Sequence, residues 1–249
     1  MFNFFANQEN KKDSFYYITG SDYNHIKNVL RMQVGDTCLV SCDGQSDLCR
    51  INSFSEEFVC LEIAEENYTS TELPVKIYLF QGLPKGDKME YIIQKCVELG
   101  IFEIIPVAMK NCVVKLDDKK AKSKVARWQA ICESAAKQSK RNIIPKISEV
   151  LPFGKALEYA KTLDMIMVPY ENKEGMKATI EALAELKTVE SVGIFIGPEG
   201  GFDKTEIEKA IESEAKTISL GKRILRTETA AITAVSMCML EIEMFEENK

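Results

Sequence analysis

Two short stretches carry residue types that could surround a ligand. IGPEGGF (196–202) places three glycines, a proline and Glu199 directly after an apolar run. LGKRILRTETAA (220–231) combines glycine, basic residues and a glutamate at the expected start of a helix. Neither stretch has the dinucleotide pattern G-x-G-x-x-G or the P-loop pattern G-x-x-x-x-G-K-[ST], and Glu199 would repel a phosphate. The sequence therefore favours a ligand without phosphate groups.

A carboxylate beside exposed backbone suits a ligand that offers hydroxyl groups, an adenine edge or positive charge. S-adenosylmethionine has all three and carries no phosphate. Its sulfonium charge disappears on methyl transfer, so a loop with backbone hydrogen bonds and little net positive charge is a reasonable binding site. From Glu199 and its neighbouring residues alone, S-adenosylmethionine is one possible ligand among several.

The elements predicted around these stretches bring them together. From residue 75, apolar runs alternate with helical segments, which is the pattern of an α/β domain with parallel strands. The predicted strands are VKIYLFQ, EIIPVAM, DMIMVPY, SVGIFIG and KTISLG, and the predicted helices lie near 87–99, 123–140, 175–187, 203–214 and 227–246. Both stretches, and a third, VPYENKEG (168–175), follow predicted strands. Because ligands bind beyond the carboxyl ends of such strands, a site is expected there.

Two of these helices begin with a recognisable capping motif. Asp87 with Glu90, and Asp203 with Glu206, have the spacing of a helix cap and its reciprocal partner. The last helix carries two apolar stripes, so two of its faces favour burial. One face can cover the sheet, and the other can meet a second subunit or a longer loop.

The first 70 residues predict a separate small β domain. Its strands are SFYYIT, DTCLVSC, DLCRINSF and EFVCLEIA, with an Asp-Gly turn between the second and third and a short helix from Ser21 or Asp22 to before Gly35. The polar stretch EENYTSTELP then ends at Pro74. We expect domains at 1–70 and 75–249, with the boundary near this proline.

Composition excludes several classes of protein. His25 is the only histidine and no C-x-x-C occurs, so neither a structural zinc site nor a Ser-His-Asp hydrolase is expected, and no metal is predicted. The eight cysteines are scattered through apolar segments, as reduced core thiols would be. No membrane-length apolar run occurs and the N-terminus does not resemble a secretion signal, so a cytoplasmic protein is expected.

The charge is unevenly distributed. The 249 residues carry a net charge of -6, but residues 110–146 hold eleven basic residues against three acids, a local charge of +8. A solvated lysine-rich face is one interpretation. A surface that follows a phosphate backbone is the other.

Five motifs in this order resemble the SPOUT class of RNA methyltransferases, and within it the ribosomal RNA small subunit methyltransferase E family. They are HIKNVLRMQVGD (25–36), PKGDKMEYIIQKCVELGI (84–101), ESAAKQSKRNIIPKI (133–147), IGPEGGF and LGKRILRTETAA, and they span nearly the whole chain. The resemblance implies an α/β fold: a C-terminal trefoil-knot methyltransferase domain with an N-terminal PUA-like β-barrel that helps to hold RNA. It also implies a homodimer that methylates N3 of a uridine in 16S ribosomal RNA, within the 30S subunit, using S-adenosylmethionine.

The resemblance also implies roles for individual residues. Those that would bind the cofactor are Pro169, Tyr170, Gly197, Pro198, Glu199, Gly200, Gly201, Leu220, Gly221, Ile224, Leu225 and Thr227. Those that would bind RNA are His25, Arg31, Gln138, Lys140 and Arg141. Beyond the resemblance, the chemistry of the residues suggests a mechanism: Arg226 would stabilise the negative charge on O2 or O4 of the uracil anion, and Glu228 or a water molecule would take the N3 proton.

Simpler interpretations stand beside these roles. His25 could make a local hydrogen bond, Arg31 an exposed ion pair, and Glu228 only a favourable charge at a helix start. A SPOUT methyltransferase for a different RNA, or an inactive RNA-binding protein with this fold, are the alternative functions.

Overall fold

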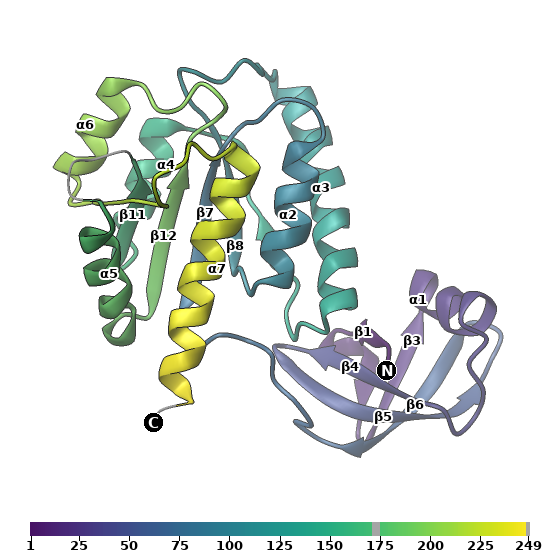
Figure 1. The fold of residues 1–249 in the computed structure, drawn as a ribbon. Coiled ribbons are helices and arrows are strands. Elements are labelled where there is room, and N and C mark those ends of the chain that lie inside the picture. The colour runs from purple at the N-terminus through teal and green to yellow at the C-terminus, as the bar shows by residue number, and fades with distance from the viewer. Residues whose placement is uncertain (171–174, 248–249) are drawn as a thin grey trace. The chain divides into compact units, whose positions relative to one another are not determined.

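The structure is a computed structural model that describes residues 1–170 and 175–247. Contacts group the chain into two compact units (Figure 1). The first comprises Met1–Glu72 and Ala136–Ile144, and the second Leu73–Ala135 and Pro145–Lys249.

The first unit is built on a six-stranded sheet in the order β1-β4-β5-β6-β3-β2. Its strands are β1 (Asn3–Phe5), β2 (Lys11–Lys12), β3 (Phe15–Thr19), β4 (Thr37–Cys42), β5 (Gln45–Phe54) and β6 (Phe58–Glu65). All neighbours pair antiparallel except β1 and β4. A two-residue turn joins β4 to β5, and both Asp43 and Gly44 have a positive φ, as the predicted Asp-Gly hairpin requires.

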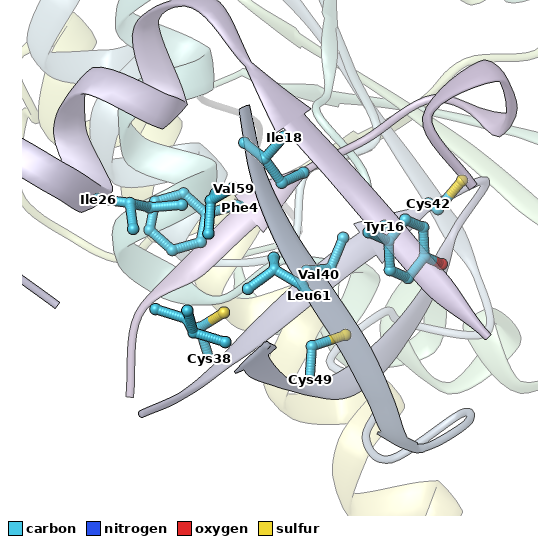
Figure 2. Close-up of a cluster of buried hydrophobic side chains, with 11 residues drawn as sticks. Phe4, Tyr16, Ile18, Ile26, Cys38, Val40, Cys42, Cys49, Val59 and Leu61 are labelled. Atoms are coloured by element: carbon cyan, nitrogen blue, oxygen red, sulfur yellow. The ribbon is translucent and has the colours of Figure 1, made fainter. Parts of the chain in front are cut away.

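Short helices complete the first unit. They are η1 (Gln8–Asn10), α1 (Gly20–Asn24) and η2 (His25–Val29), a π-helical turn that continues α1. The predicted helix after β3 is thereby confirmed, but it ends at Val29, and Arg31 follows with a positive φ of 53°. The core lies between this helix and the curled sheet, where Phe4, Ile26 and Leu61 are fully buried (Figure 2).

Residues 136–144 belong to the first unit because of a buried ion pair. The guanidinium of Arg141 is 2% exposed and donates to both carboxylate oxygens of Glu72. The amides of Asn142 and Ile143 also donate to Glu72, and the Asn3 side chain donates to the Arg141 carbonyl. Glu72 therefore holds this segment through charge and backbone together.

The second unit contains a parallel sheet in the order β10-β8-β7-β12-β11-β13, with β9 also paired to β8. The strands are β7 (Lys76–Gly82), β8 (Glu103–Ala108), β9 (Lys146–Ile147), β10 (Leu151–Pro152), β11 (Met165–Pro169), β12 (Ser191–Ile196) and β13 (Lys216–Ile218). The carboxyl ends of β12, β11 and β13 are adjacent. The three stretches singled out in the sequence follow these three strands.

Helices cover this sheet. They are α2 (Lys88–Glu98), α3 (Asp118–Ser139), α4 (Phe153–Ala160), α5 (Met176–Glu185), η3 (Leu186–Thr188), α6 (Lys204–Glu212) and α7 (Thr227–Glu246). The last helix, α7 (yellow in Figure 1), packs on β7 and β12 and touches α2 and α5. It buries Ala231, Ala234, Val235, Cys238 and Ile242.

Most predicted elements are confirmed. The five strands and the five helices predicted for the second unit all occur close to the expected positions. The capping box at Asp203 and Glu206 is also confirmed. The one at Asp87 is wrong, since the Asp87 side chain makes no cap and Glu90 pairs with Arg127 instead. The sequence interpretation missed α4 and the short strands β1, β2, β9 and β10.

The cysteines are reduced core residues, as predicted. All eight are buried and free, and burial raises the pKa of the Cys38 thiol to about 12. Within the described ranges, no helix has the length and apolar character needed to cross a lipid bilayer.

Candidate active site

A cavity of about 640 Å³ opens at the carboxyl ends of β11, β12 and β13. Pro169, Ile196 and Ile218, the last residues of these strands, lie in its wall. The loop 197–202 forms one side, and the segment 219–227 forms another. Residues 171–174 of the third stretch lie outside the described residues.

Eleven of the twelve residues implied for the cofactor line this cavity. They are Pro169, Tyr170, Gly197, Pro198, Glu199, Gly201, Leu220, Gly221, Ile224, Leu225 and Thr227. The twelfth, Gly200, is exposed and packs on Asn111, where an added Cβ would lie 3.0 Å from the Asn111 Cβ. Contact of these residues with a cofactor stays a prediction.

Two glycines in the cavity wall have backbone conformations that L-residues rarely adopt. The φ angle is +67° at Gly201 and +102° at Gly221. A side chain at either position would strain the backbone. The glycines therefore set the path of the two loops that face each other across the cavity.

Glu199 joins the loop 197–202, called the cofactor loop because the sequence predicts that it holds the cofactor, to the start of α2. Its Oε1 accepts hydrogen bonds from the backbone amide of Lys85 at 3.0 Å and from the Lys88 ammonium at 2.8 Å. Partial burial alone would raise the pKa of Glu199, but the hydrogen bonds from Lys88 and Lys85 outweigh burial and leave this pKa below its ordinary value. Glu199 is therefore ionised at neutral pH and braces the loop.

Lys88 also faces the first turn of α7. Its Nζ lies 3.6 Å from Oε2 of Glu228, a buried oxygen without a hydrogen-bond donor among the described residues. The hydrogen bond to Glu199 is the largest cause of a raised pKa at Lys88, and Glu228 adds to it. One ammonium group thus serves two carboxylates, of which Glu199 lines the cavity and Glu228 is not among the lining residues.

Thr227 ties the start of α7 to the sheet and to the cofactor loop. Its hydroxyl donates to the Gly197 carbonyl at 2.7 Å and accepts from the buried Gln81 amide at 2.9 Å. Gln81 lies on β7, so three separate segments meet at one hydroxyl. This network fixes the position of Arg226 and Glu228, the residues on either side of Thr227.

The loop after β8 supports the cofactor loop from its other side. Asn111 donates to the carbonyls of Gly200 and Gly201, at 3.2 and 3.3 Å. Lys110 binds Asp203, the cap of α6, with 2.8 Å between Nζ and Oδ1. The hydrogen bond from Lys110 is the largest cause that lowers the pKa of Asp203 to about 2.

Basic side chains stand at the mouth of the cavity. Lys222, Arg223 and Arg226 line it and are exposed, and none of the three has an ion-pair partner among the described residues. Arg226 directly precedes α7 with an extended backbone. Its guanidinium is therefore available to a ligand.

Sequence reasoning missed Lys88, although it lies within the quoted motif PKGDKMEYIIQKCVELGI. A lysine next to the predicted cap Asp87, in the first turn of a predicted helix, was the available signal. Its partners Glu199 and Glu228 are more than a hundred residues away, so the pattern gave no sign of the pairing.

The residues implied for RNA binding lie in the first unit and differ in exposure. His25, Arg31, Gln138 and Lys140 are exposed. Arg141 is instead buried against Glu72, so its guanidinium is not available to a phosphate in this structure. This burial conflicts with the prediction that Arg141 binds RNA. A local count of charges could not reveal the distant partner Glu72.

The comparisons with known proteins agree with this geometry. A family model described as RNA methyltransferase domain matches residues 71–239, and one described as RNA methyltransferase PUA domain matches residues 18–63. The ribosomal RNA small subunit methyltransferase E of Bacillus subtilis is 42% identical, over 92% of this chain and 91% of that protein. The chain belongs to the ribosomal RNA small subunit methyltransferase E family.

Solved structures of similar proteins place the fold in the same family. The ribosomal RNA small subunit methyltransferase E of Neisseria gonorrhoeae, bound to S-adenosyl methionine, has a TM-score of 0.79 and 30% identity and covers 95% of this chain and 96% of its own. A putative methyltransferase of Legionella pneumophila, in complex with the same cofactor, has a TM-score of 0.82 and 29% identity, with coverage of 96% and 97%. The α/β methyltransferase domain and the N-terminal PUA-type domain expected from the sequence are thus family features of this chain.

Proposed function

We propose that this chain transfers a methyl group from S-adenosylmethionine to N3 of a uridine in 16S ribosomal RNA. The observation that carries the proposal is the cavity in which the two motif loops meet at the carboxyl ends of three parallel strands. Its volume of about 640 Å³ lies within the range of small-molecule sites.

Different residues in and near the cavity have different roles in methyl transfer. S-adenosylmethionine, when bound, supplies the methyl group, whose carbon bonds to uracil N3 while the electron pair of the broken carbon–sulfur bond stays on sulfur. Arg226 stabilises the negative charge that develops on O2 or O4 as N3 loses its proton. Glu228 accepts that proton and later releases it to water.

The two parts of the chain have separate tasks in this proposal. Residues 1–70 act as the PUA-like RNA-binding domain and residues 75–249 as the methyltransferase domain. His25, Arg31, Gln138 and Lys140 contact RNA, which their exposure supports. The cofactor is held by the residues that line the cavity.

The assembly is also part of the proposal. The last helix closes a trefoil knot, and its second apolar stripe meets another copy of the chain. In support, Leu240 and Met244 are 49% and 52% exposed. The substrate is the 16S ribosomal RNA within the 30S subunit, and the protein works in the cytoplasm without a metal.

Mass spectrometry of ribosomal RNA nucleosides from cells that lack this protein tests the reaction. Loss of 3-methyluridine from 16S RNA is expected, and an unchanged level would point to a different RNA. Calorimetric titration with S-adenosylmethionine tests the alternative of an inactive RNA-binding protein, because absence of binding would contradict methyltransferase activity.

A further inference from the structure

Lys88, Glu199 and Glu228 form a charged cluster that connects three segments of the second unit. Lys88 begins α2, Glu199 lies in the cofactor loop and Glu228 lies in the first turn of α7. The three segments meet at one ammonium group, 2.8 Å from Glu199 and 3.6 Å from Glu228. Lys88 and Glu199 both line the cavity.

The charges of the cluster are not balanced. Two carboxylates share one cation, and the side chains are only partly exposed, at 32% for Lys88, 26% for Glu199 and 16% for Glu228. Glu228 depends on Lys88 most, because its buried Oε2 has no hydrogen-bond donor among the described residues. Without the ammonium group, two neighbouring carboxylates would repel each other, so the Glu228 side chain would have to move.

We propose that Lys88 is a positioning residue for methyl transfer. Its ammonium group holds the cofactor loop against the first turn of α7 and keeps the Glu228 carboxylate in the position where it accepts the N3 proton. The assignment of the proton acceptor rests on the proposed function. The coupling of Lys88 to Glu228 does not, since it follows from the contacts alone.

The chain offers a matched control on the same helix. Lys95 is 33% exposed and forms an ion pair of 2.8 Å with Glu98, so its environment resembles that of Lys88 in exposure and pairing. It does not line the cavity. Lys88→Met and Lys95→Met therefore remove the same charge from the same helix, and only the first touches the site.

Single-turnover methylation of 30S subunits, with saturating S-adenosylmethionine, measures the effect. Lys88→Met is expected to slow methyl transfer by about 10- to 100-fold, as a displaced catalytic group does. Lys88→Arg is expected to restore most of the rate, and Lys95→Met to keep the wild-type rate. Calorimetry should show that Lys88→Met weakens cofactor binding by no more than about 5-fold, the effect of losing a partly exposed ion pair.

A double-mutant cycle tests whether Lys88 acts through Glu228. If it does, Lys88→Met combined with Glu228→Gln is no slower than Glu228→Gln alone. The same cycle, measured as thermal stability, is expected to be non-additive. A rate for Lys88→Met equal to that of Lys95→Met, or rate effects that multiply, would overturn the proposal.

Failure of the proposed function gives a different result. In that case the wild-type protein itself forms no 3-methyluridine. The stability cycle and the cofactor titration need no RNA, so they still decide whether Lys88 couples to Glu228. Additive stability effects would overturn the coupling.

Discussion

At the scale of single residues, a substitution of Arg226 tests the proposed chemistry most directly. It lines the cavity, precedes α7 directly and has no ion-pair partner among the described residues. Arg226→Ala is expected to lower the single-turnover rate by about 100- to 1000-fold, because a preorganised donor to the developing anion is lost. Calorimetry should give a cofactor affinity close to that of the wild type.

Arg223→Ala is the control for this prediction. Arg223 lines the same cavity and is also exposed, but it does not adjoin the first turn of α7. Arg226→Lys keeps the charge without the planar fork and should recover part of the rate. If Arg226→Ala abolishes cofactor binding while the chemical step stays normal, the assigned role is wrong.

The chemical roles of single residues could be predicted from the sequence, but the residues they pair with could not. The prediction that Glu199 disfavours a phosphate needed only its place in the glycine-rich loop. Its role as a brace depends on Lys88, which is 111 residues earlier in the chain. The RNA-binding prediction for Arg141 had the same limit: its buried partner Glu72 lies 69 residues earlier in the chain, so local sequence gave no sign of the ion pair.

At the scale of elements, the start of α6 is pH-sensitive. Hydrogen bonds lower the pKa of Asp203 from 3.8 to about 2, and the largest contribution comes from Lys110, followed by the side chain and amide of Thr205. A carboxyl group whose pKa is lower in the folded state stabilises the fold above its unfolded pKa, and this stabilisation disappears as the pH falls through the folded pKa. Asp203→Asn keeps the cap acceptor for the Thr205 amide and removes the charge.

Urea unfolding of the wild type and Asp203→Asn, from neutral pH to about pH 2.5, checks this expectation. The wild type should be more stable at all pH values above 3.8, and the difference should shrink as the pH falls toward 2. Lys110→Met should remove the largest share of this pH-dependent stabilisation and leave the share due to Thr205. A difference that stays constant down to the lowest pH would show that the pairing with Lys110 contributes nothing.

A close contact between β7 and the cofactor loop gives a second element-scale prediction. A Cβ on Gly82 would lie 2.7 Å from both the Cδ and the backbone nitrogen of Pro198. Gly82→Ala should therefore displace the loop, lower the free energy of unfolding by about 1–3 kcal/mol and weaken cofactor binding.

Gly154→Ala is the matched control for Gly82→Ala. Gly154 lies in α4, and a Cβ there would meet nothing within 4 Å. Its stability should stay level or rise, since alanine favours helix more than glycine does. Denaturant unfolding and calorimetry with S-adenosylmethionine measure both variants. Wild-type stability and affinity in Gly82→Ala would contradict the requirement for glycine.

The elements themselves were largely predictable because their signals are local. The apolar runs of β7, β8, β11, β12 and β13 and the cap of α6 depend on neighbouring residues. The two-residue strands β9 and β10 are too short to carry a pattern. The order β12-β11-β13 also has no local signal, since it depends on how distant strands pair.

At the scale of the whole molecule, net charge is a poor guide to the RNA-binding surface. Within the described part of the chain, six of the eleven basic residues of 110–146 form ion pairs with acids, and three of these acids lie in the first or last third of the sequence. The six are Lys110, Lys120, Arg127, Lys137, Arg141 and Lys146. The local charge of +8 therefore overstates what a phosphate backbone would meet.

Lys140 is the sharpest test of what remains of that surface. It is exposed, and a positive φ of 58° holds it just beyond the end of α3. Each cation that replaces a condensed counterion contributes about one unit to the salt slope of RNA binding, so Lys140→Gln should flatten the slope by roughly one. Lys204→Gln, an exposed lysine on α6, should leave it unchanged. Fluorescence anisotropy with a 16S RNA fragment across salt concentrations measures both slopes. Equal slopes for wild type and Lys140→Gln would show that Lys140 makes no phosphate contact and belongs to a solvated lysine-rich face.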